Sequence, residues 1–153
     1  MHMDWLISKT GMLVAFFILL GVMYGAYDIY DEYAAQREVE AVVLSISNQI
    51  AFVANTAPEY SAKKRIDFPD YIHGEPYIFT VDDERHNIRI RLMGKFSQKN
   101  ITEFAILPQS VIITEGFNSK GEVSAGTTFD DMNMSSAIVV SKNNGYILIS
   151  AVV

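Results

Sequence analysis

The feature of this sequence that most constrains its fold is an uncharged apolar stretch near the start. Between Thr10 and Tyr27 no side chain is charged. These roughly 18 residues would span about 27 Å as an α-helix, close to the ~30 Å hydrocarbon core of a bilayer. Each apolar side chain favours insertion by about 0.3–0.6 kcal/mol, whereas one central Asp would cost about 2.5–3.5 kcal/mol. The stretch predicts a transmembrane helix at 10–30, after a short cytoplasmic tail at 1–9.

Two other interpretations of the stretch are a buried helix of a soluble protein and a cleaved secretory signal. A buried helix needs a large surrounding shell, which the remaining chain is too short to supply. A secretory cut needs small residues at positions −3 and −1. With Gly25 or Ala26 at −1, the bulky Met23 or Tyr24 would occupy −3. We therefore expect the helix to be retained.

The charges that flank the stretch predict its direction. Lys9 precedes it, whereas Asp28, Asp31 and Glu32 follow it. Positive charge favours the cytoplasmic side. We expect a single-pass protein of the cell membrane with its N-terminus in the cytoplasm and its C-terminal domain outside.

The helix is predicted to continue beyond the membrane as an amphipathic segment at 31–56. No Gly, Pro or Asn interrupts 26–47, and apolar residues then recur three and four positions apart, which places them on one helix face. That stripe is Val39, Val42, Ile46, Ile50 and Val53. We expect it to pack on the chain's own β-domain and on copies of the same helix. Gly21 and Gly25 would permit close helix approach, or they are simply small residues that membrane helices tolerate.

The remainder, 57–153, is predicted to be an extracytoplasmic β-rich domain. Alternation with a period of two marks 77–81 and 86–92 around a polar turn, with further strands at 111–114 and 122–128. The clearest hairpin joins 137–140 to 146–149 through Asn143-Asn144-Gly145. The predicted fold is α+β: a long N-terminal helix, transmembrane and then amphipathic, packed on six or seven mostly antiparallel strands in one small sheet or sandwich.

Composition and motifs give no support for an enzyme. The chain has no cysteine, which excludes thiolate metal sites, and its net charge of −6 disfavours nucleic acid as a partner. His2, His73 and His86 are scattered, and the acidic groups at 82–84 and 130–131 do not fit a calcium loop. We predict no catalytic residue, cofactor or metal site. An enzyme on a membrane tether is the third and weakest interpretation.

Two tripeptides are candidate glycosylation sites in an exported domain. They are Asn100-Ile101-Thr102 and Asn133-Met134-Ser135. We expect at least one of these asparagines to carry a glycan in the native host.

The layout resembles that of type IV pilin-like proteins, most closely the archaeal ones. The likeness rests on the apolar helix that becomes amphipathic and on the Pro–Gly–Tyr stretch at 66–79. Phe16 stands where bacterial pilins carry a Glu, which favours the archaeal type or a protein that is not a pilin. The resemblance implies a class III signal, cut on the cytoplasmic side after Gly11 so that Met12 becomes the first residue.

Two functions follow as alternatives. The first is a structural subunit of a filament or pilus-like assembly at the cell surface, with the bilayer, copies of itself or related pilin-like subunits as partners. The second is a permanently anchored extracytoplasmic binding protein, similar to archaellum stator proteins that hold the surface layer. A mere tether would not need about seven helical turns beyond the membrane, so the sequence favours the filament subunit.

Overall fold

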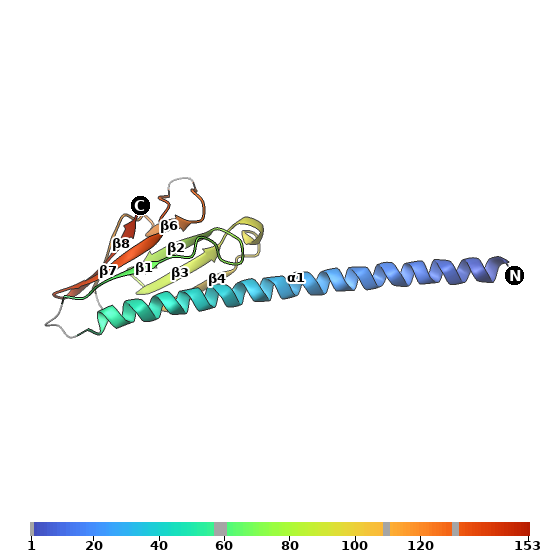
Figure 1. Cartoon of the computed structure of the whole chain (residues 1–153), viewed down its shortest axis with the longest axis horizontal. Coiled ribbons are helices and arrows are strands. Elements are labelled where there is room, and N and C mark those ends of the chain that lie inside the picture. Colours follow the sequence, from blue (N-terminus) through green and yellow to red (C-terminus); the bar gives the residue numbers. More distant parts are fainter. Residues whose placement is uncertain (1, 57–60, 109–110, 130–131) are drawn as a thin grey trace. The chain divides into compact units, whose positions relative to one another are not determined.

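A computed structural model describes residues 2–56, 61–108, 111–129 and 132–153, with the side chain of His2 left undescribed (Figure 1). One helix, α1, runs from His2 to Ala54. The chain divides into two compact units, Met1–Ala34 and Ala35–Val153. The last third of α1 therefore belongs to the unit that contains the strands.

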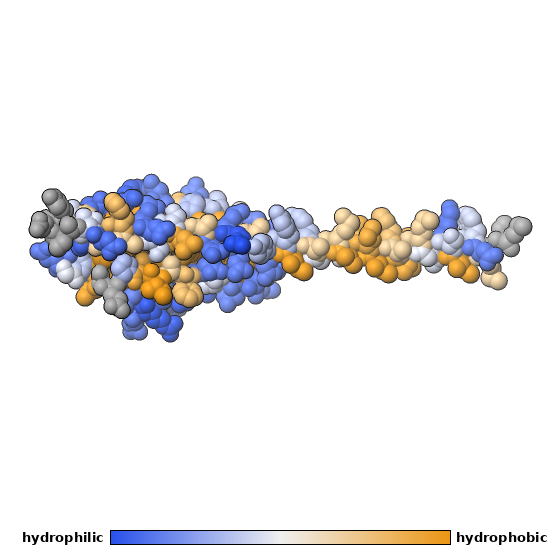
Figure 2. Space-filling view, turned by 90° about the horizontal axis from the view of Figure 1, so that it is seen from below, coloured by the Kyte–Doolittle hydropathy of each residue, from blue (hydrophilic) through white to orange (hydrophobic). Residues whose placement is uncertain are grey.

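The first unit is a largely apolar stretch of α1 with exposed side chains. Every described side chain up to Tyr30 is exposed, although many are large and hydrophobic. Figure 2 shows orange apolar side chains along this stretch. An 18-residue window of α1 near the N-terminus is long and apolar enough to cross a membrane, and none of it is buried. A helix satisfies all its interior backbone hydrogen bonds internally, which is what a lipid environment requires.

The second unit contains two four-stranded sheets, shown in Figure 1 beside the C-terminal part of α1. One sheet has the order β1-β7-β8-β5: Lys63–Asp67, Ala137–Asn143, Tyr146–Val152 and Val111–Glu115. The other has the order β4-β3-β2-β6: Thr102–Ile106, Asn87–Leu92, Tyr77–Asp82 and Glu122–Ala125. A short 3₁₀-helix, η1, occupies Gly94–Phe96. All neighbouring strands are antiparallel except β5 and β8, which are parallel.

One hydrophobic core joins both sheets to the C-terminal part of α1. On β2, Tyr77, Phe79 and Val81 lie at alternate positions and belong to this core, while Ile78 on the other face is buried outside it. The core also takes Ile88, Ile90 and Leu92 from β3, Ile138 and Val140 from β7, and Ile46 and Ile50 from α1. The predicted α+β arrangement is confirmed.

The predicted end of the helix and the two predicted hairpins of the β-domain are also found. α1 ends at Ala54, two residues before the predicted end of the segment 31–56. Strands β7 and β8 pair up to Asn143 and Tyr146, leaving a two-residue turn in which Gly145 has φ of 94°. Glycine suits the second position of this turn because the backbone there has positive φ.

The described residues hold eight strands rather than six or seven, because β1 and β4 were not predicted. Strand β1 carries two lysines and an arginine, and Ile66 is its one buried side chain. Strand β4 shows the reverse of the usual pattern, since the small Ala105 is buried while Phe104 and Ile106 are exposed. Neither segment has the alternation that identifies a strand in sequence.

Candidate functional site

The two residues of the predicted processing site, Gly11 and Met12, lie inside α1, and both are exposed. The predicted packing glycines, Gly21 and Gly25, lie further along the same helix. A Cβ added at any of these three glycines would meet no atom within 4 Å outside the helix's own backbone. The helix surface at Gly21 and Gly25 is therefore open to a second helix or to lipid.

The apolar stripe of the amphipathic segment belongs to the chain's own core. Val39, Ile46, Ile50 and Val53 are at most 3% exposed, and Val42 is half-buried at the edge of the core. Ala35 and Val43 are buried as well, although the sequence did not single them out. Within one chain, these side chains already pack against the strands.

Two polar contacts hold the start of this buried helix segment. The Gln36 side-chain amide donates to the Glu103 carboxylate on β4 at 2.9 Å. The Glu38 carboxylate lies 2.9 Å from Nδ1 of His73, a half-buried residue with φ of 53° in the loop before β2. These contacts fix the helix against strand β4 and that loop.

The C-terminus of α1 is held by one lysine. The Lys142 ammonium group, on β7, donates hydrogen bonds to the carbonyl oxygens of Ala54 and Thr56. The last carbonyls of a helix have no partner inside the helix, and they carry partial negative charge. Lys142 therefore supplies both hydrogen bonds and the favourable charge.

His86 and the acidic residues at 82–84 and 130–131 are the remaining titratable groups singled out from the sequence. His86 is half-buried at the start of β3, and neither its Nδ1 nor Oδ1 of Asn87 has a hydrogen-bond partner. Among the described residues, no group of three His, Asp or Glu side chains is placed to hold a metal ion. The acidic pair 130–131 lies outside the described residues.

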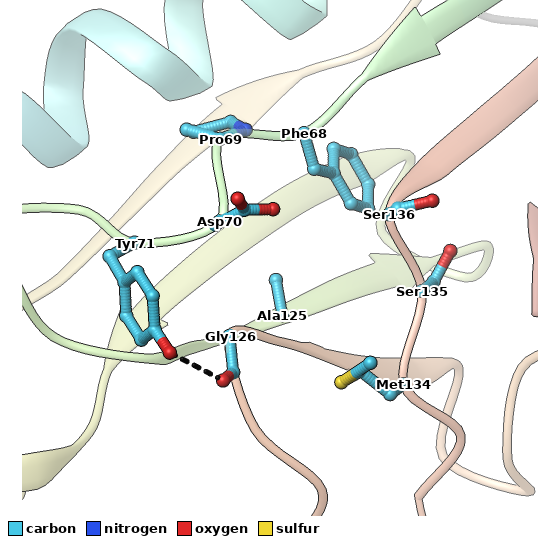
Figure 3. A pocket seen from close by; sticks show the side chains of 9 residues that line it. All are labelled: Phe68, Pro69, Asp70, Tyr71, Ala125, Gly126, Met134, Ser135 and Ser136. Atoms are coloured by element: carbon cyan, nitrogen blue, oxygen red, sulfur yellow. Dashed lines mark hydrogen bonds between the residues drawn. The ribbon is translucent and has the colours of Figure 1, made fainter.

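A pocket of about 230 Å³ opens between the loop after β1 and the segments on either side of the 130–131 gap (Figure 3). The Tyr71 hydroxyl donates to the Gly126 carbonyl oxygen at 3.1 Å across its mouth. The Ser135 hydroxyl lies 2.7 Å from the Ala137 carbonyl oxygen. Asp70 is the one titratable carboxyl group among the residues that line the pocket, and no histidine accompanies it there. Among the described lining residues, Ser135 therefore has no histidine beside it.

A second hollow, of about 340 Å³, lies on the outer face of the β4-β3-β2-β6 sheet. We call it the arginine hollow because Arg89 and Arg91, both half-buried, project into it from the inner strand β3. It is lined by Thr80, Arg89, Arg91, Asn100, Thr102, Phe104 and Glu122. Sequence reasoning identified 86–92 as a strand with one polar face, but it did not treat these arginines as a site.

The two candidate glycosylation sites differ in their surroundings. Asn100 is exposed in the turn before β4, and its Oδ1 lies 3.4 Å from the Thr102 hydroxyl. Asn133 is also exposed, but its side-chain amide donates to the Gly116 carbonyl oxygen at 3.4 Å. Both asparagines are on the surface, and Asn100 has the freer side-chain nitrogen.

Comparison with known protein families, with curated proteins and with solved structures found no match.

Proposed function

We propose that this chain is a non-enzymatic, membrane-anchored surface protein that serves as a pilin-like structural subunit of a filament. One observation carries the proposal: α1 contains an uncovered apolar segment and then continues as the helix on which both sheets pack. A chain that only needed an anchor could end its helix at the membrane surface. Here the anchoring helix is also a structural part of the outward domain.

The surface of α1 also has the features that helices need in order to associate in a membrane. Apolar side chains gain little when they exchange lipid for one another, so helices associate in membranes through close packing and polar contacts. The open surfaces at Gly21 and Gly25 permit such packing. The stripe from Val39 to Val53 is occupied by the β-domain, so the contacts between copies fall on the segment before Ala35.

The proposal is tested by mapping the N-terminal peptide of native protein by mass spectrometry. Membrane fractions are compared with material sheared from the cell surface. We expect the sheared protein to begin at Met12, which makes the residues up to Gly11 a processing signal. Protein that keeps its first residues and stays wholly in the membrane fraction contradicts the filament subunit.

That contrary result would favour the second candidate, a permanently anchored binding protein. The arginine hollow supports this candidate, because it is a concave polar site on the outward domain. The surface layer is then the expected partner. Cross-linking of intact cells, followed by identification of the attached proteins, would separate a surface-layer partner from further copies of this chain.

A further inference from the structure

The arginine hollow has the chemistry of a ligand site, and we infer that it binds a carboxylate-bearing saccharide. The inference concerns the second unit alone, so it holds for either candidate function. It follows from three features of the hollow: its arginines, its single carboxylate and its aromatic side chain.

The arginines form a pair without an internal partner. Arg89 and Arg91 occupy alternate positions of β3, so both leave the same face of the sheet, roughly 7 Å apart. The chain's other three arginines, Arg37, Arg65 and Arg85, each pair with a carboxylate. In the described part of the chain, no side-chain hydrogen bond or ion pair of Arg89 or Arg91 is found.

This absence of a partner is informative because the chain has 18 acidic residues and 12 basic ones. Two guanidinium groups that lie side by side repel each other, and the repulsion is relieved when an anion binds between them. The planar guanidinium fork fits a carboxylate with two parallel hydrogen bonds. The pair is therefore suited to hold one carboxylate.

The opposite wall of the hollow limits what else the ligand can be. Glu122 pairs with Thr80, which in turn pairs with Arg89, so Glu122 lies two strands away from the arginine. Its carboxylate accepts a hydrogen bond from the Asn118 amide at 3.3 Å. A densely charged polyanion would be repelled by Glu122. A ligand with one carboxylate on each sugar ring, flanked by hydroxyl donors, satisfies both walls.

An aromatic side chain and neutral polar groups complete the match to a sugar. Phe104 pairs directly with Arg89 across the strands and is 63% exposed. Its flat ring offers an apolar surface for the C–H face of a pyranose. The hydroxyl groups of Thr80 and Thr102 can exchange hydrogen bonds with sugar hydroxyls. Uronic-acid units combine these groups in one ring.

The test is isothermal titration of the full-length chain in detergent micelles with trigalacturonate. The protein is used with Asn100 unmodified, as verified by intact mass. Maltotriose, triglutamate and inorganic phosphate serve as the neutral, peptide and free-anion comparisons. We expect trigalacturonate to bind more tightly than all three. Equal binding of maltotriose, triglutamate or phosphate overturns the assignment to an acidic sugar.

Variants locate the site. Arg89→Gln and Arg91→Gln should each weaken trigalacturonate binding by at least about tenfold, because each removes a charged hydrogen-bonding fork. Arg89→Lys should also weaken it, since an ammonium group cannot make the paired hydrogen bonds. The matched control is Arg65→Gln, which removes an arginine outside the hollow and should leave affinity unchanged. Circular dichroism verifies that each variant is folded. An equal loss of binding in the control, or none at Arg89 and Arg91, overturns the site.

Discussion

The Tyr77 hydroxyl donates a hydrogen bond to the Pro69 carbonyl oxygen at 2.7 Å, in the interior of the second unit. Burial, together with the nearby Asp70 carboxylate, raises the pKa of this hydroxyl above its ordinary value. The folded protein therefore holds Tyr77 in its neutral form at a pH where the unfolded chain would ionise it. The free energy of unfolding therefore depends on the ionisation of this one hydroxyl group at alkaline pH.

The pKa shift predicts how stability changes with pH. A raised folded pKa leaves the full stabilisation below the unfolded pKa of 10.0 and loses it as the pH climbs above that value. The contribution of Tyr77 to the free energy of unfolding should fall by about 1.4 kcal/mol per pH unit there. Urea unfolding of wild type and Tyr77→Phe in micelles, followed by circular dichroism, measures this.

The comparison with the variant isolates Tyr77 from the other groups that titrate at high pH. Near neutral pH, Tyr77→Phe should be less stable by about 1 kcal/mol, because the Pro69 carbonyl loses its donor. Above the unfolded pKa the gap should shrink and then reverse. A difference in the free energy of unfolding that stays constant between about pH 7 and about pH 11 contradicts the shifted pKa.

Lys142 predicts a second effect at the scale of one residue. Lys142→Met keeps much of the aliphatic length but leaves the Ala54 and Thr56 carbonyl oxygens without their charged donor. We expect a loss of about 1–3 kcal/mol in the free energy of unfolding. Lys120→Met, at an exposed loop position, is the control and should change stability by less than about 0.5 kcal/mol.

Asn100 predicts a chemical modification. Its exposed turn and the nearby Thr102 hydroxyl suit a glycosylation site, whereas the Asn133 amide already donates a hydrogen bond. Glycopeptide mass spectrometry of native protein should find a glycan on Asn100 in preference to Asn133. Unmodified mass at both asparagines contradicts the prediction.

At the scale of secondary structure, α1 has two parts whose surfaces behave differently. Before Ala35 its apolar side chains are exposed, and beyond it they alternate between core and solvent. The same hydrophobic residue type therefore has a different energetic role on the two sides of this position. In the second part, a buried and an exposed apolar residue can be substituted on the same helix, so that the two variants differ chiefly in the burial of the side chain.

Ile50→Ala and Leu44→Ala form such a matched pair. Ile50 is 0% exposed, whereas Leu44 is 49% exposed on the same helix. Ile50→Ala should lower the free energy of unfolding by about 2–5 kcal/mol, because a buried aliphatic side chain leaves a cavity. Leu44→Ala should lower it by less than about 1 kcal/mol, since its side chain is largely in contact with solvent. Similar losses at both positions would argue against this packing.

The elements that could be predicted from the sequence are those with a clear hydrophobic periodicity or a clear turn motif. Helix α1 followed from its uninterrupted apolar run and stripe, and the β7–β8 hairpin followed from Asn144-Gly145 between two β-rich runs. Strands β1 and β4 did not follow, because tertiary pairing with β7 and β3 makes them strands despite their weak alternation. The arginine hollow was also missed, since it needs Arg89, Phe104 and Glu122 from three different strands.

At the scale of the whole molecule, the helix at the N-terminal end is long and apolar enough to cross a membrane. The chain has no cysteine, so a single introduced cysteine is a unique label. We predict that Ser119→Cys, in the exposed loop before β6, reacts with a membrane-impermeant maleimide on intact cells. Ser8→Cys, at the other end of the apolar segment, should react only after the cells are opened.

Labelling of Ser8→Cys alone contradicts an outward β-domain, and labelling of both positions before lysis contradicts a helix that crosses the membrane between them. The two serines are both exposed in the structure, so a difference in labelling reports the membrane and not burial within the protein. A cut after Gly11 would remove position 8, so the label at Ser8→Cys is read only on chains that keep their first residues.

The strand order β1-β7-β8-β5 has a consequence for biogenesis. The two inner strands of that sheet, β7 and β8, are the last ones synthesised, while the outer strands β1 and β5 are made earlier. Until the C-terminal hairpin has been synthesised, Ile66 and Ile112 have no sheet partner. Folding of this sheet must therefore wait for its C-terminal hairpin, and the earlier strands are exposed to misassociation in the interval.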